Sequence, residues 1–211
     1  MTNANATVLV IDDDADLREA IARLLRSVDM NSRLFASVAD FLKSDLPAGP
    51  VCLVLDVRLP GKSGLELQHE LAAAKRQLPI IFITGHGDIP MSVQAMKRGA
   101  IEFLTKPFRH QDLLDAISVG LSCDRARREN EKTLASVGER FGALSPRERE
   151  IIIQVARGRL SKQIAGDIGI TESTVKVHRS KAMRKMNVRT LPELGRLAEK
   201  FQLVVEKPQR F

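Results

Sequence analysis

The sequence predicts two domains: an α/β domain built on a doubly wound parallel sheet of five strands, and a small all-α domain with a helix-turn-helix. Short runs rich in Val, Ile and Leu alternate with helical patterns over the first 120 residues, which is typical of buried parallel strands. From residue 143 onward only short helical patterns remain. A length of 211 residues accommodates two modest domains of this kind.

The first domain is expected to contain five β/α units. Its strands are predicted at Thr7–Ile11, Ser32–Phe35, Val51–Leu55, Ile80–Thr84 and Ile101–Thr105. The helices that follow them carry apolar residues on one face. They are predicted over Ala15–Val28, from the cap Ser37 to Leu42, around Leu65–Leu71, over Met91–Arg98 with Gly99 ending it, and from about Gln111.

The last of these helices is predicted to continue as a linker. Its apolar stripe ends at Leu121, and Asp124–Lys132 is almost entirely charged, which is typical of a solvated spacer. The expected boundaries are 1–121 for the first domain, 122–142 for a long helical linker and 143–211 for the second domain. An apolar spacing near the end of the linker predicts a short helix docked on the second domain, through Leu134, Val137, Phe141 and Leu144.

The second domain is predicted to contain four short helices. The first begins at the capping box Ser145-Pro146-Arg147-Glu148, the second at Ser161, and the third extends from the cap Thr171 to about Met186. The tight turn at Gly169-Ile170, between the second and the third, is typical of a helix-turn-helix. The fourth helix carries Leu194, Leu197, Ala198 and Phe201 on one face.

Basic residues are concentrated in the second domain. Residues 144–211 contain 15 Lys and Arg against 7 Asp and Glu, whereas residues 1–120 contain 13 against 15. This asymmetry favours a polyanion as partner, nucleic acid before membrane, with a merely basic surface as the alternative. The two cysteines indicate no disulfide framework, no apolar run is long enough for a membrane span, and no secretion signal is evident. A cytoplasmic location is therefore expected.

Polar side chains follow four predicted strands at their carboxyl ends, namely Asp12-Asp13, Asp56, Thr84 and Lys106. Open α/β sheets bind ligands at this edge. Three carboxylates that face one lysine and one hydroxyl suit a hard divalent cation and a phosphoryl group. Each residue alone has an ordinary alternative, since Asp12-Asp13 could cap a helix and Lys106 could be solvated. Asp56 is harder to explain in that way, because an unpaired carboxylate that ends an apolar strand is costly.

Six stretches of the sequence form a specific pattern through their order and spacing. They are Val-Ile-Asp-Asp-Asp (10–14), Leu-Asp-Val-Arg-Leu-Pro-Gly-Lys-Ser-Gly (55–64), Ile-Thr-Gly-His-Gly-Asp-Ile-Pro-Met (83–91), Gly-Ala-Ile-Glu-Phe-Leu-Thr-Lys-Pro-Phe (99–108), Leu-Ser-Pro-Arg-Glu (144–148) and Thr-Glu-Ser-Thr-Val-Lys-Val-His-Arg (171–179). With them nearly the whole chain resembles the bacterial two-component response regulators of the NarL/FixJ class, a receiver domain joined to a LuxR-type helix-turn-helix. The third stretch is most similar to the FixJ subgroup.

The resemblance implies that Asp56 is the phosphoacceptor. It would attack the phosphorus of a phosphohistidine in line, on a sensor histidine kinase. Mg²⁺ would be bound directly by Asp13, Asp56 and the main-chain carbonyl of Arg58, with Asp12 acting through water. No organic cofactor is expected, and any enzymatic activity would be limited to slow self-catalysed phosphotransfer and dephosphorylation.

The resemblance also implies a switch. Lys106 would pair with the phosphoryl oxygens, Thr84 would donate a hydrogen bond to them, and the Lys106–Pro107 peptide bond would be cis. Phe103 would turn inward behind Thr84. Because the chain contains no Tyr, that inward state would depend on apolar burial alone, and Phe103 as a permanent core residue is the alternative.

The surface expected to respond is the helix Met91–Arg98 with the strand Ile101–Thr105. Its adaptable apolar side chains would form a two-fold dimer contact through Met91, Val93 and Met96. Arg58 and His86 each lie two residues beyond a site residue, and they are expected to tune hydrolysis of the phosphoaspartate.

The third helix of the second domain is expected to enter the major groove of duplex DNA. Val175, Ala182 and Met186 share one face, which should contact the core. By resemblance, base edges would be contacted by Lys176, Val177 and Ser180, and phosphates would be bound by Thr171, Thr174, Lys181, Arg184 and Lys185. His178 is expected to pack at the helix junction rather than to contact bases.

These residues together predict a phosphorylation-controlled transcription factor, and an activator is expected. It would form a homodimer on phosphorylation, bind paired promoter half-sites and act on RNA polymerase. Two alternatives stay open. A phosphohydrolase with an aspartate nucleophile would need an acid at position 58, where Arg58 stands. A phosphorylation-independent DNA-binding or adaptor protein would carry a degenerate switch.

Overall fold

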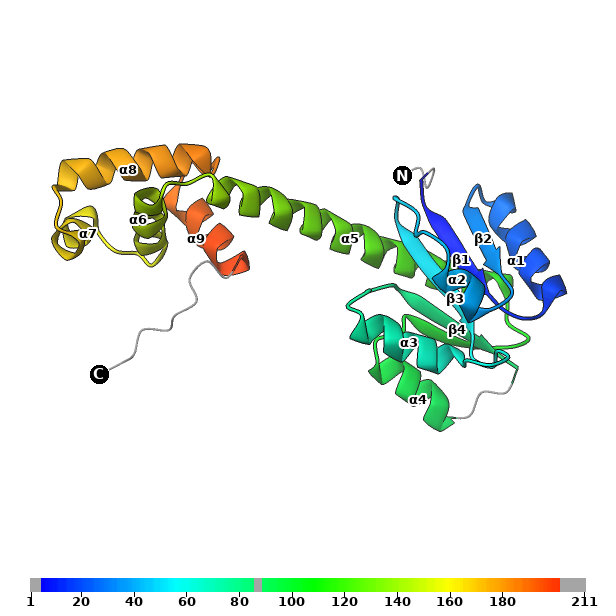
Figure 1. The fold of residues 1–211 in the computed structure, drawn as a ribbon. Helices are drawn as coiled ribbons and strands as arrows, with labels where there is room; N and C mark the ends of the chain where they lie inside the picture. Colours follow the sequence, from blue (N-terminus) through cyan, green and yellow to red (C-terminus); the bar gives the residue numbers. More distant parts are fainter. Residues whose placement is uncertain (1–4, 86–88, 202–211) are drawn as a thin grey trace. The chain divides into compact units, whose positions relative to one another are not determined.

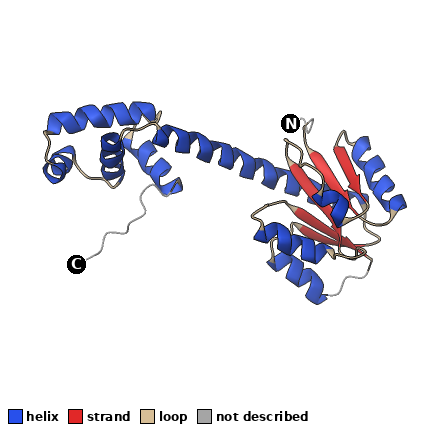
Figure 2. Ribbon diagram, in the orientation of Figure 1, coloured by secondary structure: helices blue, strands red, loops and turns tan. Residues whose placement is uncertain are grey.

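The computed structural model describes residues 5–85 and 89–201. The chain divides into two compact units, residues 1–129 and residues 130–211. Figure 1 labels the helices of both units and the strands β1 to β4, and Figure 2 separates helices from strands by colour. Among the described residues, none of the helices combines the length and the apolar character that a membrane crossing requires.

The first unit contains the parallel five-stranded sheet that the sequence predicts. Its strands, in the spatial order β2-β1-β3-β4-β5, are β1 (Thr7–Ile11), β2 (Asn31–Phe35), β3 (Val51–Asp56), β4 (Ile80–Thr84) and β5 (Glu102–Thr105). The helices are α1 (Ala15–Ser27), α2 (Val38–Leu42), α3 (Gly64–Ala73), α4 (Ile89–Lys97) and α5 (His110–Gly142). The doubly wound fold class is confirmed, and only the ends of individual elements move by one to two residues.

Helices cover both faces of this sheet (Figure 2). Successive residues of a strand point to opposite faces, so β3 sends Leu53 and Leu55 into one apolar core and Cys52 and Val54 into the other. The first core is closed by α2, α3 and α4, and the second by α1 and α5. Helix α5 lies very near β3, because a Cβ atom at Gly120 would be 2.5 Å from Cys52 Sγ. Only a glycine at position 120 permits this close approach of the α5 backbone to Cys52.

The expectation of a solvated segment from Asp124 onward is wrong at Asp124 itself, which is fully buried. Its Oδ2 accepts hydrogen bonds from Val51 N at 2.9 Å and from Arg128 Nε at 2.6 Å, and its Oδ1 accepts one from Arg127 Nε at 3.1 Å. Residues at i, i+3 and i+4 share one helix face, so a run of charges can be an ion-paired face that packs on the domain. Burial raises the pKa of Asp124, but the hydrogen bonds from Arg127 and Arg128 outweigh it and the net pKa is lowered.

The second unit contains the four predicted helices, α6 (Pro146–Ala156), α7 (Ser161–Ile168), α8 (Glu172–Lys185) and α9 (Leu191–Lys200). The capping box at Ser145 and Glu148 is present, and Gly169 adopts φ 69° at the turn of the helix-turn-helix. Val137, Phe141 and Leu144 pack into the core of this unit, as expected. They do not form a separate short helix, however, because Val137 and Phe141 belong to the last turns of α5.

Candidate functional site

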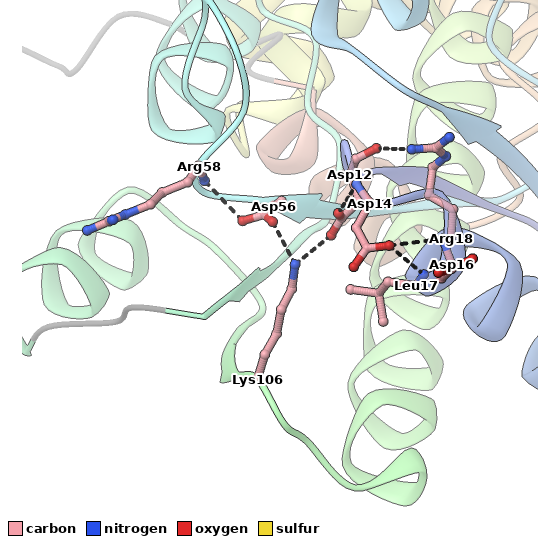
Figure 3. A network of polar contacts seen from close by, with 8 residues as sticks. All are labelled: Asp12, Asp14, Asp16, Leu17, Arg18, Asp56, Arg58 and Lys106. Atoms are coloured by element: carbon pink, nitrogen blue, oxygen red, sulfur yellow. Dashed lines mark hydrogen bonds and ion pairs between the residues drawn. The ribbon is translucent and has the colours of Figure 1, made fainter.

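Three aspartates and one lysine meet at the carboxyl ends of the strands of the first unit. Lys106 Nζ, directly after β5, donates to Asp12 Oδ2 at 2.7 Å and to Asp56 Oδ2 at 2.6 Å (Figure 3). Carboxylate oxygens of Asp12, Asp13 and Asp56 lie within 4.8 Å of one another. The parallel topology thus brings to one point residues that are up to 94 positions apart in the sequence.

The remaining oxygens of the buried carboxylates are bound by main-chain N–H groups. Asp12 Oδ1 accepts from Asp14 N at 2.9 Å, and Asp56 Oδ1 accepts from Arg58 N at 3.0 Å (Figure 3). Asp12 and Asp56 are buried, whereas Asp13 is exposed. These bonds fix the orientation of both buried carboxylates.

Charge is unbalanced in this cluster, because three carboxylates face one ammonium group. Burial raises the pKa of Asp12, although the hydrogen bond from Lys106 acts in the opposite direction. Burial lowers the pKa of Lys106, but the hydrogen bonds to Asp12 and Asp56 outweigh it, so the net pKa is raised and the lysine is charged. An excess of negative charge on oxygen donors alone is the environment that Mg²⁺ prefers. The residues therefore fit a hard divalent cation.

The loop after β3 is held against Asp56. Gly64 N, at the start of α3, donates to Val57 O at 3.0 Å, and a Cβ atom at Gly64 would lie 2.3 Å from the main-chain oxygen of Asp56. No other residue fits there without displacing the backbone that carries Asp56.

Thr84 and Phe103 lie on neighbouring strands beside this cluster. Thr84 ends β4 and is fully buried, and its main-chain oxygen accepts from Lys106 N at 2.7 Å, which positions the lysine. The Lys106–Pro107 peptide bond is cis, as expected. The Phe103 ring is half-buried and lies 6.2 Å from the ring of Phe82. Its side chain is therefore neither fully inside the core nor free in solvent.

Helix α4 presents exposed apolar side chains. Val93 and Met96 are exposed and Met91 is half-buried, as a contact surface requires. Ile89 was not among the residues predicted for this surface, and it is the most exposed of these apolar side chains, with an exposed fraction of 80%. The side chain of Arg58 is exposed beside the cluster, and His86 lies outside the described residues.

Helix α8 presents a core face and a solvent face, as its sequence predicts. Val175, Ala182 and Met186 are fully buried. Of the residues expected to contact DNA, only Thr174 is half-buried. The others are exposed, namely Thr171, Lys176, Val177, Ser180, Lys181, Arg184 and Lys185. Thr171 caps the helix, since its Oγ1 accepts from Thr174 N at 3.2 Å. His178 is half-buried, consistent with packing at the junction.

Two of these lysines form ion pairs that the sequence did not predict. Lys185 Nζ lies 2.6 Å from Glu148 Oε2, and Lys176 Nζ lies 2.7 Å from Glu172 Oε1. Glu148 is buried, and the hydrogen bonds from Lys185 and from Ser145 N lower its pKa to about 2. Lys185 is thereby tied to α6, which the capping pattern of Glu148 alone does not indicate.

The sequence also did not predict the position of two arginines, one in the middle of α8 and one beyond its end. Arg179 and Arg189 line a hollow of about 400 Å³ together with Ser180 and Arg184. Three guanidinium groups around one hollow suit a phosphate of the DNA backbone. Arg189 lies beyond α8, so helical periodicity gives no sign of its place.

Comparison with known proteins covers both units. Residues 8–118 match the response regulator receiver domain, and residues 142–198 match the bacterial regulatory proteins of the luxR family. Nodulation protein W of Bradyrhizobium diazoefficiens is 48% identical over 197 residues, covering 93% of this chain and 87% of that protein. Transcriptional regulatory protein FixJ of Azorhizobium caulinodans is 44% identical over 193 residues, covering 90% of each chain.

A solved structure of the response regulator StyR is similar over 93% of this chain and 100% of that chain, with 49% identity and a TM-score of 0.82. The fold and both domain matches place the chain among the DNA-binding response regulators of bacterial two-component systems. Within that class it belongs to the NarL/FixJ family, with a receiver domain followed by a LuxR-type helix-turn-helix. These proteins regulate transcription and are not classical enzymes, so the phosphohydrolase alternative is set aside.

Proposed function

We propose that the chain is switched by phosphorylation of Asp56, which increases its binding to paired promoter half-sites. The observation that carries the proposal is the unbalanced cluster, in which Lys106 bridges the buried carboxylates of Asp12 and Asp56 and Asp13 lies beside them. A merely structural ion pair would not need a third carboxylate. The partner that supplies the phosphoryl group is a sensor histidine kinase in the cytoplasm.

In the proposed transfer, a carboxylate oxygen of Asp56 attacks the phosphorus of a phosphohistidine. A P–O bond forms, the P–N bond breaks, and the electron pair returns to the imidazole of the kinase. Arg58 N holds one oxygen of Asp56, which orients the carboxylate for in-line attack. Lys106 Nζ already lies 2.6 Å from the other oxygen, and it would neutralise charge on the incoming group.

Mg²⁺ would supply further neutralisation of the phosphoryl oxygens. Asp13, Asp56 and the main-chain carbonyl of Arg58 would hold it directly, with Asp12 through water, because Mg²⁺ is bound by few protein oxygens and several waters.

The signal would pass from Asp56 to α4. Thr84 would turn its hydroxyl toward the phosphoryl group, and Phe103, which is half-buried at present, would move into the space behind it. The neighbouring surface of Met91, Val93 and Met96 would then bind a second copy around a two-fold axis.

The dimer would place two copies of α8 in successive major grooves, with Lys176, Val177 and Ser180 at base edges. Phosphates would be bound by Thr171, Thr174, Lys181, Arg184 and Lys185, the last of which also pairs with Glu148. Contact with RNA polymerase would make the protein an activator.

Incubation with radiolabelled acetyl phosphate and Mg²⁺ tests the phosphoacceptor. Wild type should acquire a label that is lost at alkaline pH, Asp56→Asn should acquire none, and the control Asp115→Asn, at an exposed position of α5, should label normally. In a binding assay on promoter DNA, the phosphorylated wild type should bind at least about tenfold more tightly, within the usual range of coupling between sites. Equal DNA binding in both states would favour the phosphorylation-independent alternative.

The two classes of DNA contact are separable by salt. Lys176→Ala should relax the preference for the cognate sequence by about 1–3 kcal/mol, whereas Lys181→Ala should weaken binding to all sequences and reduce the salt slope by about one unit. Titrations of cognate and scrambled duplexes at several salt concentrations measure both. Identical behaviour of the two variants would contradict the assignment.

A further inference from the structure

We infer that a pocket at the edge of the receiver sheet opposite Asp56 binds a small organic anion, a carboxylate or a phosphate monoester on an apolar body. The pocket holds about 290 Å³ and lies wholly within the first unit. It is bounded by the last turn of α3, the residues after α4, the start of β4 and α5, and its wall includes Leu71, Arg76, Ile80, Arg98 and Arg127. The inference does not depend on phosphorylation of Asp56.

Positive charge exceeds negative charge around this pocket. Three arginines line it, and the single carboxylate, Asp124, is already bound by Arg127 and Arg128. Arg76 and Arg98 have no ion pair and no side-chain hydrogen bond with any residue of the described ranges. Both follow the carboxyl ends of helices, where a cation is favoured by the helix dipole. Their guanidinium groups nevertheless keep all their donors available, and a guanidinium binds carboxylate and phosphate groups in a bidentate manner.

The inner wall contains an unmet hydrogen-bond acceptor. Gln68 is only 4% exposed, and its Nε2 donates to Ala95 O at 3.2 Å. Its Oε1 is buried and has no hydrogen-bond partner among residues 5–85 and 89–201. Buried polar atoms nearly always have a partner, so an acceptor without one in the wall of a pocket indicates a missing donor. A hydroxyl or N–H group on a bound molecule would supply that donor.

The rest of the wall defines the body of the ligand. Leu71, Leu78, Pro79 and Ile80 provide the apolar part of the lining. The lining contains no aromatic residue, which disfavours a stacked nucleobase. Its volume is at the lower limit for small-molecule sites, so the ligand is small. Because Gln68 joins α3 to α4, a bound ligand would contact the wall of the helix that carries the proposed dimer surface.

Titration of the full chain with three probes tests the site by NMR. The anions para-hydroxybenzoate and para-hydroxyphenyl phosphate carry the two anionic groups on the same ring, each with a hydroxyl donor for Gln68 Oε1, and para-hydroxybenzamide is the uncharged control. At least one anion should bind saturably with a dissociation constant of about 1 mM or lower. It should shift the Gln68 side-chain amide and the Gly99 amide, and para-hydroxybenzamide should bind at least about fivefold more weakly. The stronger of the two anions identifies the head group.

Variants separate this site from general basicity. Arg76→Ala should weaken binding of the anion at least about fivefold, and Arg98→Ala, whose arginine also borders the exposed side of α4, should act in the same direction. The matched control Arg23→Ala removes an exposed arginine of α1 that does not line the pocket, and it should change nothing. The inference is overturned if neither anion saturates by about 10 mM, if para-hydroxybenzamide binds equally well, or if Arg76→Ala and Arg23→Ala behave alike.

Discussion

Strand β3 has a buried carboxylate at each end, and the two are balanced in opposite ways. At its carboxyl end, Asp56 shares the single ammonium of Lys106 with Asp12, and Asp13 adds a third negative charge. At its amino end, Asp124 is bound by two guanidinium groups and the N–H of Val51. The carboxyl end has three carboxylates for one cation, and we call it the incomplete end. The amino end has one carboxylate for two cations, and we call it the complete end. Burial therefore does not distinguish these two carboxylates, whereas the number of cations available to each one does.

The largest expected effect is at the complete end. Asp124→Ala leaves two guanidinium groups and a main-chain N–H of β3 without their acceptor, and it should lower the free energy of unfolding of the first unit by about 3 kcal/mol. Urea unfolding followed by circular dichroism measures it. The control Asp115→Ala removes an exposed carboxylate of the same helix and should cost less than about 0.5 kcal/mol. Equal losses in the two variants would contradict a structural role for the buried Asp124.

Removal of the lysine tests the incomplete end. Lys106→Met leaves Asp12 and Asp56 facing each other without a cation, and because the lysine is partly exposed we expect a smaller loss, about 2 kcal/mol. Mg²⁺ should recover part of that loss, since a ligand of the folded state stabilises it. The same Mg²⁺ concentration should not rescue Asp124→Ala. Rescue of both variants would show that the ion acts without regard to this cluster.

Glu148 provides an intermediate case, one carboxylate with one lysine and one N–H, and it predicts a pH dependence. Its pKa is lowered from 4.5 to about 2, so the stabilisation is present above pH 4.5 and is lost as the pH falls toward 2. Melting of the second unit should therefore shift to lower temperature over this window in wild type and less in Glu148→Gln. The control Glu150→Gln, at an exposed position, should follow wild type.

The smallest effect is expected at Asp13. Asp13→Asn removes one of three clustered carboxylates from an exposed position, so without Mg²⁺ stability should be unchanged or raised by less than about 1 kcal/mol. The melting temperature of wild type should rise on addition of Mg²⁺, and that of the variant should rise much less. A loss of stability in the absence of Mg²⁺ would mean that Asp13 is held by an unrecognised partner.

The sequence was sufficient for the sheet and for the cluster at its carboxyl edge, because both depend on local patterns. Apolar runs define strands, and the residue that ends each run is placed at a common edge by the parallel topology. It was insufficient for Asp124 and Glu148. Each has one distant partner, Val51 at 73 positions and Lys185 at 37 positions, and a charged run has the same composition whether it is solvated or paired. Phe103 is a similar case, since an apolar residue of a strand does not show how far its ring is buried.

Gly120, which has only a hydrogen atom as its side chain, has a consequence for thiol chemistry. By bringing the helix backbone onto Cys52 it seals that sulfur inside the domain, and burial raises the pKa of its thiol, so the reactive thiolate is suppressed. Cys123, one turn further along, is exposed on the rim of the arginine-lined pocket. A maleimide should thus attach to one sulfur in the native protein and to two after denaturation, which provides a natural attachment point for a fluorophore in a chain that contains neither Trp nor Tyr.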